Sequence, residues 1–249
     1  MKHYLLLRLY GPMASWGDTA VGDFRPSHSH PSRTAVLGLL AAALGIRRNE
    51  EDKLLWLDQM VNVAIRLDLT GEMLRDYHTI QVPPESKKNR YYTRADELNS
   101  EKLHTIISQR DYRTDSAASV ALYSHENDKT VLEQWQTALR KPALPLYLGR
   151  KSCPLALPVD PVIIEADNLK SAFDGYPDCS TQLDALCHHR IPKPDSVQYY
   201  WEGEDAGLIS QMSYPRHDRL QSRKRWQFST RIEYYAAYPA VAAHGSGKE

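Results

Sequence analysis

The sequence has few cysteines, no long apolar run and no excess of charge of either sign. Its three cysteines, Cys153, Cys179 and Cys187, form no CxxC pair. An odd, scattered set favours reduced thiols over a disulfide framework, and it offers no zinc-ligand spacing. We also find no run of about 18 apolar residues and no signal-peptide pattern, which predicts a cytoplasmic protein without a membrane anchor.

The chain also lacks the common signatures of catalysis and cofactor binding. It contains no Gly-rich phosphate loop, no clustered pair of carboxylates and no internal repeat. Neither a metal nor a cofactor is therefore predicted. Acid–base chemistry would have to come from His28, His30 or the Tyr77-His78 pair, which has Asp76 beside it.

The charge is balanced overall but unevenly distributed. The 249 residues include 31 Lys and Arg and 31 Asp and Glu, giving a net charge of zero. Residues 86–113 hold seven basic and four acidic side chains, and residues 210–231 hold six basic side chains and one acid. Either run could be ordinary solvated surface, or it could belong to a basic face that binds a polyanion.

The hydrophobic pattern predicts an α+β fold. We expect strands at 4–10, 61–69 and 119–123, helices at 35–45, 49–60 and 129–141, and a final strand pair within 226–238. Residues 77–116 are polar, aromatic and basic, and we interpret them as a long excursion that is partly β-hairpin. A further strand near Leu146 or Val162 would complete a ferredoxin-like order of elements.

Several stretches resemble the family of CasD-type subunits of the type I-E CRISPR Cascade complex. Two weaker stretches, 112–122 and 227–233, agree in order and spacing. The four main stretches are Leu7–Gly17 (LRLYGPMASWG), Arg25–Ile46 (RPSHSHPSRTAVLGLLAAALGI), Leu74–Thr79 (LRDYHT) and Tyr147–Leu155 (YLGRKSCPL).

The resemblance implies a fold and a division of the chain. Residues 1–157 would form a ferredoxin-like, or RRM-like, domain with a β-hairpin thumb inserted at about 77–116. Residues 158–239 would form a small C-terminal β-rich part, and 240–249 a flexible tail.

The resemblance also implies a function. Such subunits bind and cap the 5′ handle of the crRNA without cutting it. They contact the backbone subunit and the large subunit, and through the complex they act on target DNA in antiviral defence. One alternative is a metal-independent endoribonuclease that processes the repeat RNA, as relatives in another subtype do. Another is an RRM-like RNA binder outside any CRISPR complex.

An RNA handle needs cations for its phosphates, aromatic rings for its bases and close backbone approach. Residues 147–151 supply all three, through Tyr147, Gly149, Arg150 and Lys151. Further candidates lie at the predicted start of the first helix, on the returning strand of the thumb and near its tip. They are Arg25, Ser32 and Arg33; Arg110, Tyr112 and Arg113; and Lys87, Lys88 and Arg90, the last three for RNA or a neighbouring subunit. Trp16 is expected to pack beneath the first loop.

Overall fold

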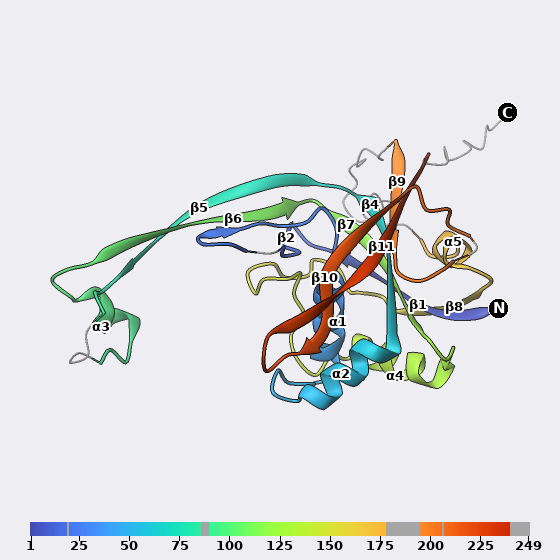
Figure 1. Cartoon of the computed structure of the whole chain (residues 1–249), viewed down its shortest axis with the longest axis horizontal. Coiled ribbons are helices and arrows are strands. Elements are labelled where there is room, and N and C mark those ends of the chain that lie inside the picture. Colours follow the sequence, from blue (N-terminus) through green and yellow to red (C-terminus); the bar gives the residue numbers. More distant parts are fainter. Residues whose placement is uncertain (19, 86–89, 178–194, 206, 240–249) are drawn as a thin grey trace.

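The computed structural model describes residues 1–18, 20–85, 90–177, 195–205 and 207–239, and they form an α+β fold (Figure 1). A seven-stranded sheet is its centre, and all of its strand pairs are antiparallel. In spatial order the strands are β10 (Met212–Ser222), β11 (Gln227–Pro239), β9 (Ser196–Trp201), β4 (Val61–Leu69), β7 (Ala117–Ser124), β1 (Lys2–Tyr10) and β8 (Val162–Ala166).

Helices cover both faces of this sheet. On one face α1 (Arg33–Ala43), α2 (Glu51–Met60) and α4 (Lys129–Arg140) contribute to a core that includes Leu5 and Leu7 of β1. On the other face α5 (Leu169–Asp174) packs in a second core with Tyr4 and Leu6. Because successive strand residues point to opposite faces, β1 is apolar at nearly every position rather than at every second one.

Most predicted elements are confirmed. β4 has the predicted bounds, and β8 supplies the further strand near Val162. The expected strand pair within 226–238 is wrong, because these residues form the single strand β11, whose hairpin partner is β10. The turn comes earlier, where the Trp226 N–H donates to the Arg223 carbonyl at 3.3 Å. No Gly, Asn or Asp lies within 227–238 to interrupt the strand.

A second sheet contains the long excursion. Its main hairpin pairs β5 (Glu72–Val82) with β6 (His104–Thr114), and it projects from the body with α3 (Arg94–Leu98) near its far end (Figure 1). Two short strands, β2 (Met13–Ala14) and β3 (Phe24–Arg25), also pair with β6. The hairpin begins at Glu72, a few residues before the predicted start, because β4 ends at Leu69 and Gly71 turns the chain with a φ of 64°.

The seven-stranded sheet is continuous across residue 157, where the sequence suggested a boundary. β8 lies after this position and pairs with β1, and β9 pairs with β4. Strands from both sides of residue 157 thus share one sheet, and the division of the chain there stays a prediction. The expected tail at 240–249 lies outside the described residues, as do Cys179 and Cys187. In the described part of the chain, no helix has the length and apolar character needed to cross a membrane.

Arg33, at the start of α1, is part of the core rather than the surface. Only 1% of it is exposed. Its Nη1 lies 2.5 Å from Glu202 Oε1 and donates to the Val61 carbonyl at 3.0 Å. Its Nη2 lies 3.3 Å from Asp58 Oδ1. One guanidinium thus joins α1 to α2, to the start of β4 and to the residue after β9.

We expect Arg33→Ala to lower the free energy of unfolding by about 3–5 kcal/mol, because it removes the ion-pair partner of buried Glu202 and one of the two arginines that pair with buried Asp58. Urea unfolding followed by circular dichroism measures this change. The exposed Arg47→Ala is the matched control and should cost well under 1 kcal/mol. Equal losses in the two variants would contradict the structural role of Arg33.

Candidate nucleic-acid interface

The candidate site is built around a gap along one edge of β6. On one edge of β6, β5 pairs with the full strand. On the other edge β3 pairs at Gln109 and Arg110, and β2 pairs at Arg113 and Thr114. The Asp111 carbonyl between them instead accepts hydrogen bonds from Ser15 Oγ at 3.2 Å and Arg150 Nη1 at 3.3 Å. Side chains therefore complete the edge where the strands stop.

Arg150 connects three segments of the chain at this gap. Besides the Asp111 carbonyl, its guanidinium donates through Nη2 to the Arg25 carbonyl at 3.1 Å. The same group lies 4.6 Å from the centroid of the Tyr112 ring, a cation–π arrangement. The sequence predicted a phosphate contact for Arg150 and a role in RNA binding for Tyr112. In the structure, Arg150 and Tyr112 attach the turn at 147–151 to β3 and β6. Tyr112 is only 8% exposed.

Gly149 brings this turn against the first loop. Its φ of 84° lies in the left-handed region, and a Cβ added there would sit 1.7 Å from the Ser15 carbonyl oxygen. Next to it, the Ser15 N–H donates to the Leu148 carbonyl at 3.0 Å. The sequence predicted that Gly149 lets the protein backbone approach the RNA closely. The close approach in the structure is to the protein's own backbone.

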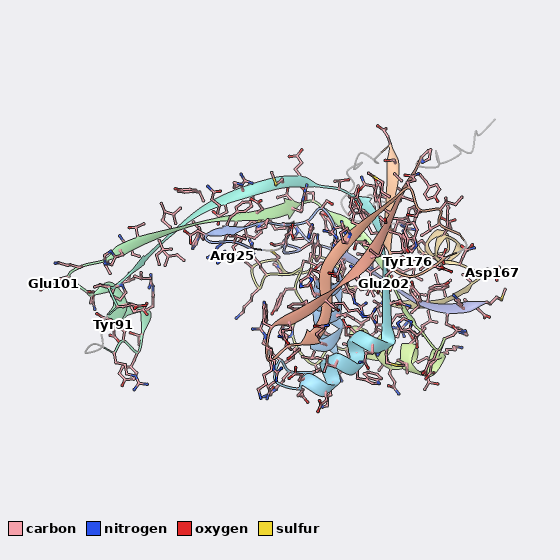
Figure 2. The ribbon with its side chains drawn as sticks, in the orientation of Figure 1. Arg25, Tyr91, Glu101, Asp167, Tyr176 and Glu202 are labelled. Carbon is pink, nitrogen blue, oxygen red and sulfur yellow. The ribbon has the colours of Figure 1, made fainter. Side chains whose placement is uncertain are left out.

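The polar and aromatic groups left accessible around this gap form what we call the junction surface. It consists of Arg25, Arg110, Tyr147 and Lys151. Arg25 and Arg110 are register partners across β3 and β6, so their side chains leave the sheet on the same face. Tyr147 is 44% exposed and Lys151 is exposed. Figure 2 shows Arg25 under the β5–β6 hairpin, near its body end.

Two predicted contacts at the start of α1 have structural roles. Ser32 is the N-cap of the helix, where its Oγ accepts the Ala35 N–H at 3.3 Å and donates to the Trp16 carbonyl at 3.2 Å. Trp16 itself is 3% exposed, as expected of a packing residue. We leave Arg33 out of the RNA-binding set, because its buried guanidinium presents no surface to a ligand.

The remaining predicted contacts belong to the hairpin. Arg113 is half-buried on β6, opposite Ala14. Arg90 is exposed near the far end, with its guanidinium 5.6 Å from the centroid of the Tyr92 ring. Lys87 and Lys88 lie outside the described residues. The structure thus brings Arg25, Arg110, Tyr147 and Lys151 around one gap, and it places Arg90 elsewhere.

Sequence reasoning missed an ion network that attaches the first loop to the C-terminal hairpin. Arg216 of β10 pairs with Glu233 of β11 at 2.7 Å, and its Nη1 lies 3.2 Å from His28 Nε2. His30 Nε2 lies 3.3 Å from Glu233 Oε2, and its ring stacks on Tyr200 with centroids 3.6 Å apart. The two histidines lie about 170 to 200 positions from these partners, so no spacing rule could have joined them.

The environment of this network sets its protonation. Burial lowers the pKa of His28 and of His30, and the charge of Arg216 lowers both further. Burial opposes ionisation of Glu233, but the hydrogen bond with His30 and the charges of Arg231 and Arg216 outweigh it. Together they hold the pKa of this carboxyl well below its usual range. At neutral pH the network therefore contains neutral imidazoles and an ionised Glu233.

The acid–base candidates lie on different elements. On β5, His78 Nδ1 is 3.7 Å from Asp76 Oδ2, and both side chains are exposed. In the first loop, His28 Nε2 is 3.1 Å from Asp18 Oδ1. Among the described residues, no group of His, Cys, Asp and Glu side chains is arranged to hold a metal ion.

Comparison with known proteins gives concordant matches. Residues 4–234 match the model of a family described as CRISPR-associated protein (Cas_Cas5). Over 186 residues the chain is 34% identical to the CRISPR system Cascade subunit CasD of Escherichia coli strain K12, covering 71% of this chain and 78% of that protein.

Two solved structures are also similar to this chain. One is a chain of a CRISPR RNA-guided surveillance complex, with a TM-score of 0.65 and 26% identity, covering 98% of this chain and 95% of that one. The other is the crystal structure of a Cas protein, with a TM-score of 0.63 and 25% identity, covering 95% of each chain.

We expect Gly149→Ala to destabilise the protein by about 2 kcal/mol or more, because the methyl group would overlap the Ser15 carbonyl and the backbone is left-handed. Gly38→Ala, in α1, is the matched control. It has open space and should be neutral or stabilising by up to about 1 kcal/mol. Thermal and urea unfolding compare the two, and an unperturbed Gly149→Ala would refute the close contact.

We expect stability to fall as the pH is lowered from about 7.5 to 5. The unfolded chain binds protons at His28 and His30 near the ordinary pKa of 6.5, whereas the lowered pKa of both rings makes the folded protein bind them only at lower pH. Each imidazole contributes at most ~1.4 kcal/mol per pH unit. Urea midpoints across this range should change less with pH in His28→Gln than in His217→Gln, which alters an exposed histidine of β10. Parallel profiles would exclude His28 as a cause.

Proposed function

This chain belongs to the Cas5 family of CRISPR-associated proteins as a CasD-type subunit, and we propose that it binds and caps the 5′ handle of the crRNA within a Cascade complex. In this role it would hold the leading end of the guide without cutting it. It would contact a backbone subunit and the large subunit, and would act on target DNA only through the assembled particle in the cytoplasm.

The observation that carries this proposal is the convergence of three segments at the junction surface. Arg25 comes from the first loop, Arg110 from the returning strand of the hairpin, and Tyr147 and Lys151 from the turn at 147–151. Single-stranded RNA is bound by cations that meet its phosphates and by aromatic faces that stack on its bases. The junction surface offers three cations and one exposed ring, and Arg150 and Gly149 hold the segments that carry them.

We also propose that the body is a ferredoxin-like, RRM-like domain and that the β5–β6 hairpin is its thumb. Support comes from the chain order β1-α1-β4-β7-α4-β8 and the spatial order β4-β7-β1-β8, which fit a split βαβ arrangement. Residues 158–239 would then add β9, β10 and β11 as a C-terminal extension of the sheet.

The hairpin is the proposed contact with the neighbouring backbone subunit. Several large apolar side chains on it are exposed, including Met73 (55%), Tyr77 (61%) and Ile107 (41%). Exposed apolar groups gathered on one projecting element are typical of a surface that a partner covers. Arg90, near α3, would meet RNA or the same partner at the far end.

The alternative function, a metal-independent endoribonuclease, has a specific candidate site. His28 is neutral at neutral pH, as a general base requires, and it lies beside Asp18 and Arg216. The same contacts also serve to anchor the first loop, so they do not demand a catalytic role. We propose that the protein does not cleave RNA.

We expect Arg110→Ala/Lys151→Ala to weaken binding of a handle RNA and to reduce its salt dependence. Each phosphate contact that is lost should lower the slope of log K against log salt by about 0.7, or about 1.4 for two contacts. Tyr147→Ala should cost at least about fivefold in affinity through lost stacking. Fluorescence anisotropy at several salt concentrations measures both effects. Arg150 is left unchanged in these variants, because its loss would release the turn.

Two controls make this test specific. Lys129→Ala/Lys170→Ala removes two exposed or half-exposed cations from α4 and α5 and should change the slope little. An equal change in both double variants would show that the junction surface is not the site. Incubation with repeat RNA in a chelating agent tests the alternative. A discrete cleavage that is lost in His28→Ala or His78→Ala would contradict a non-catalytic role.

A further inference from the structure

A second basic surface lies on other elements, where the β10–β11 turn meets the link between α1 and α2. We call it the turn surface, and its residues are Arg47, Arg48, Arg223, Lys224, Arg225 and Trp226. The Ser222 hydroxyl donates to Glu51 Oε1 at 2.5 Å, which fixes the hairpin turn against the start of α2. The basic run at 210–231, noted in the sequence, thus gains two arginines from a distant segment.

The cations of the turn surface form no ion pair within the described part of the protein, although Glu50 lies close to Arg47. No carboxylate there forms an ion pair with Arg48, Arg223 or the two basic residues that follow Arg223. Of the acids at the start of α2, Glu50 pairs with Lys53 at 2.5 Å and also accepts the Arg47 N–H, and Glu51 accepts the Ser222 hydroxyl. Burial, and then the charge of Arg48, lowers the pKa of Arg223. These two arginines therefore repel each other, and a bound anion would relieve that repulsion.

Trp226 adds an aromatic face beside these cations. Its indole is 61% exposed. The Arg223 guanidinium lies 4.1 Å from the ring centroid, and Phe228 meets the ring edge-on with centroids 5.8 Å apart. Its backbone φ is 56°, a conformation that bulky residues seldom adopt. The backbone is therefore locally strained at Trp226, where the large ring is exposed at the end of the hairpin.

A groove runs from the turn surface along α1. Its volume is 340 Å³, and Arg48, Arg223 and Phe228 line one part of it. Ala35, Gly38 and Ala42 of α1 form its floor, and Tyr147 lines another part. The small residues on α1 leave room beside the helix, and no side chain of the described residues fills it.

We propose that the turn surface is a second site for single-stranded nucleic acid, in which Arg48 and Arg223 hold phosphates and a base stacks on Trp226. Paired cations and an exposed ring beside an open groove are the features with which proteins bind such strands without sequence preference. An acidic protein segment would use the cations but would gain little from the indole. This site goes beyond binding of the handle, because the groups that hold its phosphates and base, Arg48, Arg223 and Trp226, are not residues of the junction surface.

The test uses the full chain and labelled oligonucleotides of about 12 nucleotides, poly(U) RNA and poly(dT) DNA, in anisotropy titrations over a range of salt. The titrations are made on Arg110→Ala/Lys151→Ala, which weakens the junction surface, because saturating handle RNA would itself compete for a site without sequence preference. We expect binding to persist under these conditions. In Arg48→Ala/Arg223→Ala the slope against log salt should fall by about 1.4. Trp226→Ala should lose about tenfold in affinity, and Trp226→Phe should retain most of it.

The control Lys129→Ala/Lys170→Ala removes the same number of charges from outside the groove. Tighter binding of poly(U) or of poly(dT) would identify RNA or DNA as the preferred strand. Three results would overturn the proposal. They are no binding when the junction surface carries Arg110→Ala/Lys151→Ala, equal effects of Arg48→Ala/Arg223→Ala and Lys129→Ala/Lys170→Ala, or equal binding of poly-glutamate with no effect of Trp226→Ala. Handle binding should stay normal in Arg48→Ala/Arg223→Ala. It is measured separately, so failure of the turn surface can be told apart from failure of the proposed function.

Discussion

The contacts made by the Gly149–Arg150 turn hold the candidate interface together. A single guanidinium bonds the carbonyls of Arg25 and Asp111 and lies against Tyr112, so it joins the first loop to the returning strand of the hairpin. Gly149 allows this by placing its backbone against Ser15. Without this junction, the turn that carries Tyr147 and Lys151 would move independently of the β3–β6 pair that carries Arg25 and Arg110, and ordering it would cost entropy at the moment of binding.

The chain contains two kinds of arginine, among others, that composition alone does not distinguish. Arg33, Arg66 and Arg231 are paired with carboxylates inside the protein, and Arg33 and Arg66 also bond groups distant in sequence, at Glu202 and at the Phe173 carbonyl. Arg25, Arg48 and Arg223 are accessible and have no carboxylate partner among the described residues. The net charge of zero therefore hides local excesses of positive charge, and these excesses are the surfaces that a polyanion would meet.

Local patterns predicted the elements well, because strands buried on both faces and a capped helix leave clear signals, as in β1 and at Ser32. They could not predict side-chain roles that depend on distant partners. Arg33 was expected at a phosphate, but Glu202, 169 positions away, holds it in the core. Arg150 was expected to face RNA, but its guanidinium donates to the Asp111 carbonyl, which lies in the gap between β2 and β3. The ion network of His30 and Glu233 was missed for the same reason.

The most direct test of the account is to locate the 5′ handle on this subunit in the assembled particle. A guide RNA with 4-thiouridine in its handle can be photocrosslinked in the intact complex, and the modified peptides identified by mass spectrometry. We expect crosslinks in the peptides that contain Tyr147 and Arg110, on either side of the Arg150 junction. Crosslinks confined to α5 and β8, on elements that contribute nothing to the junction surface, would contradict the account.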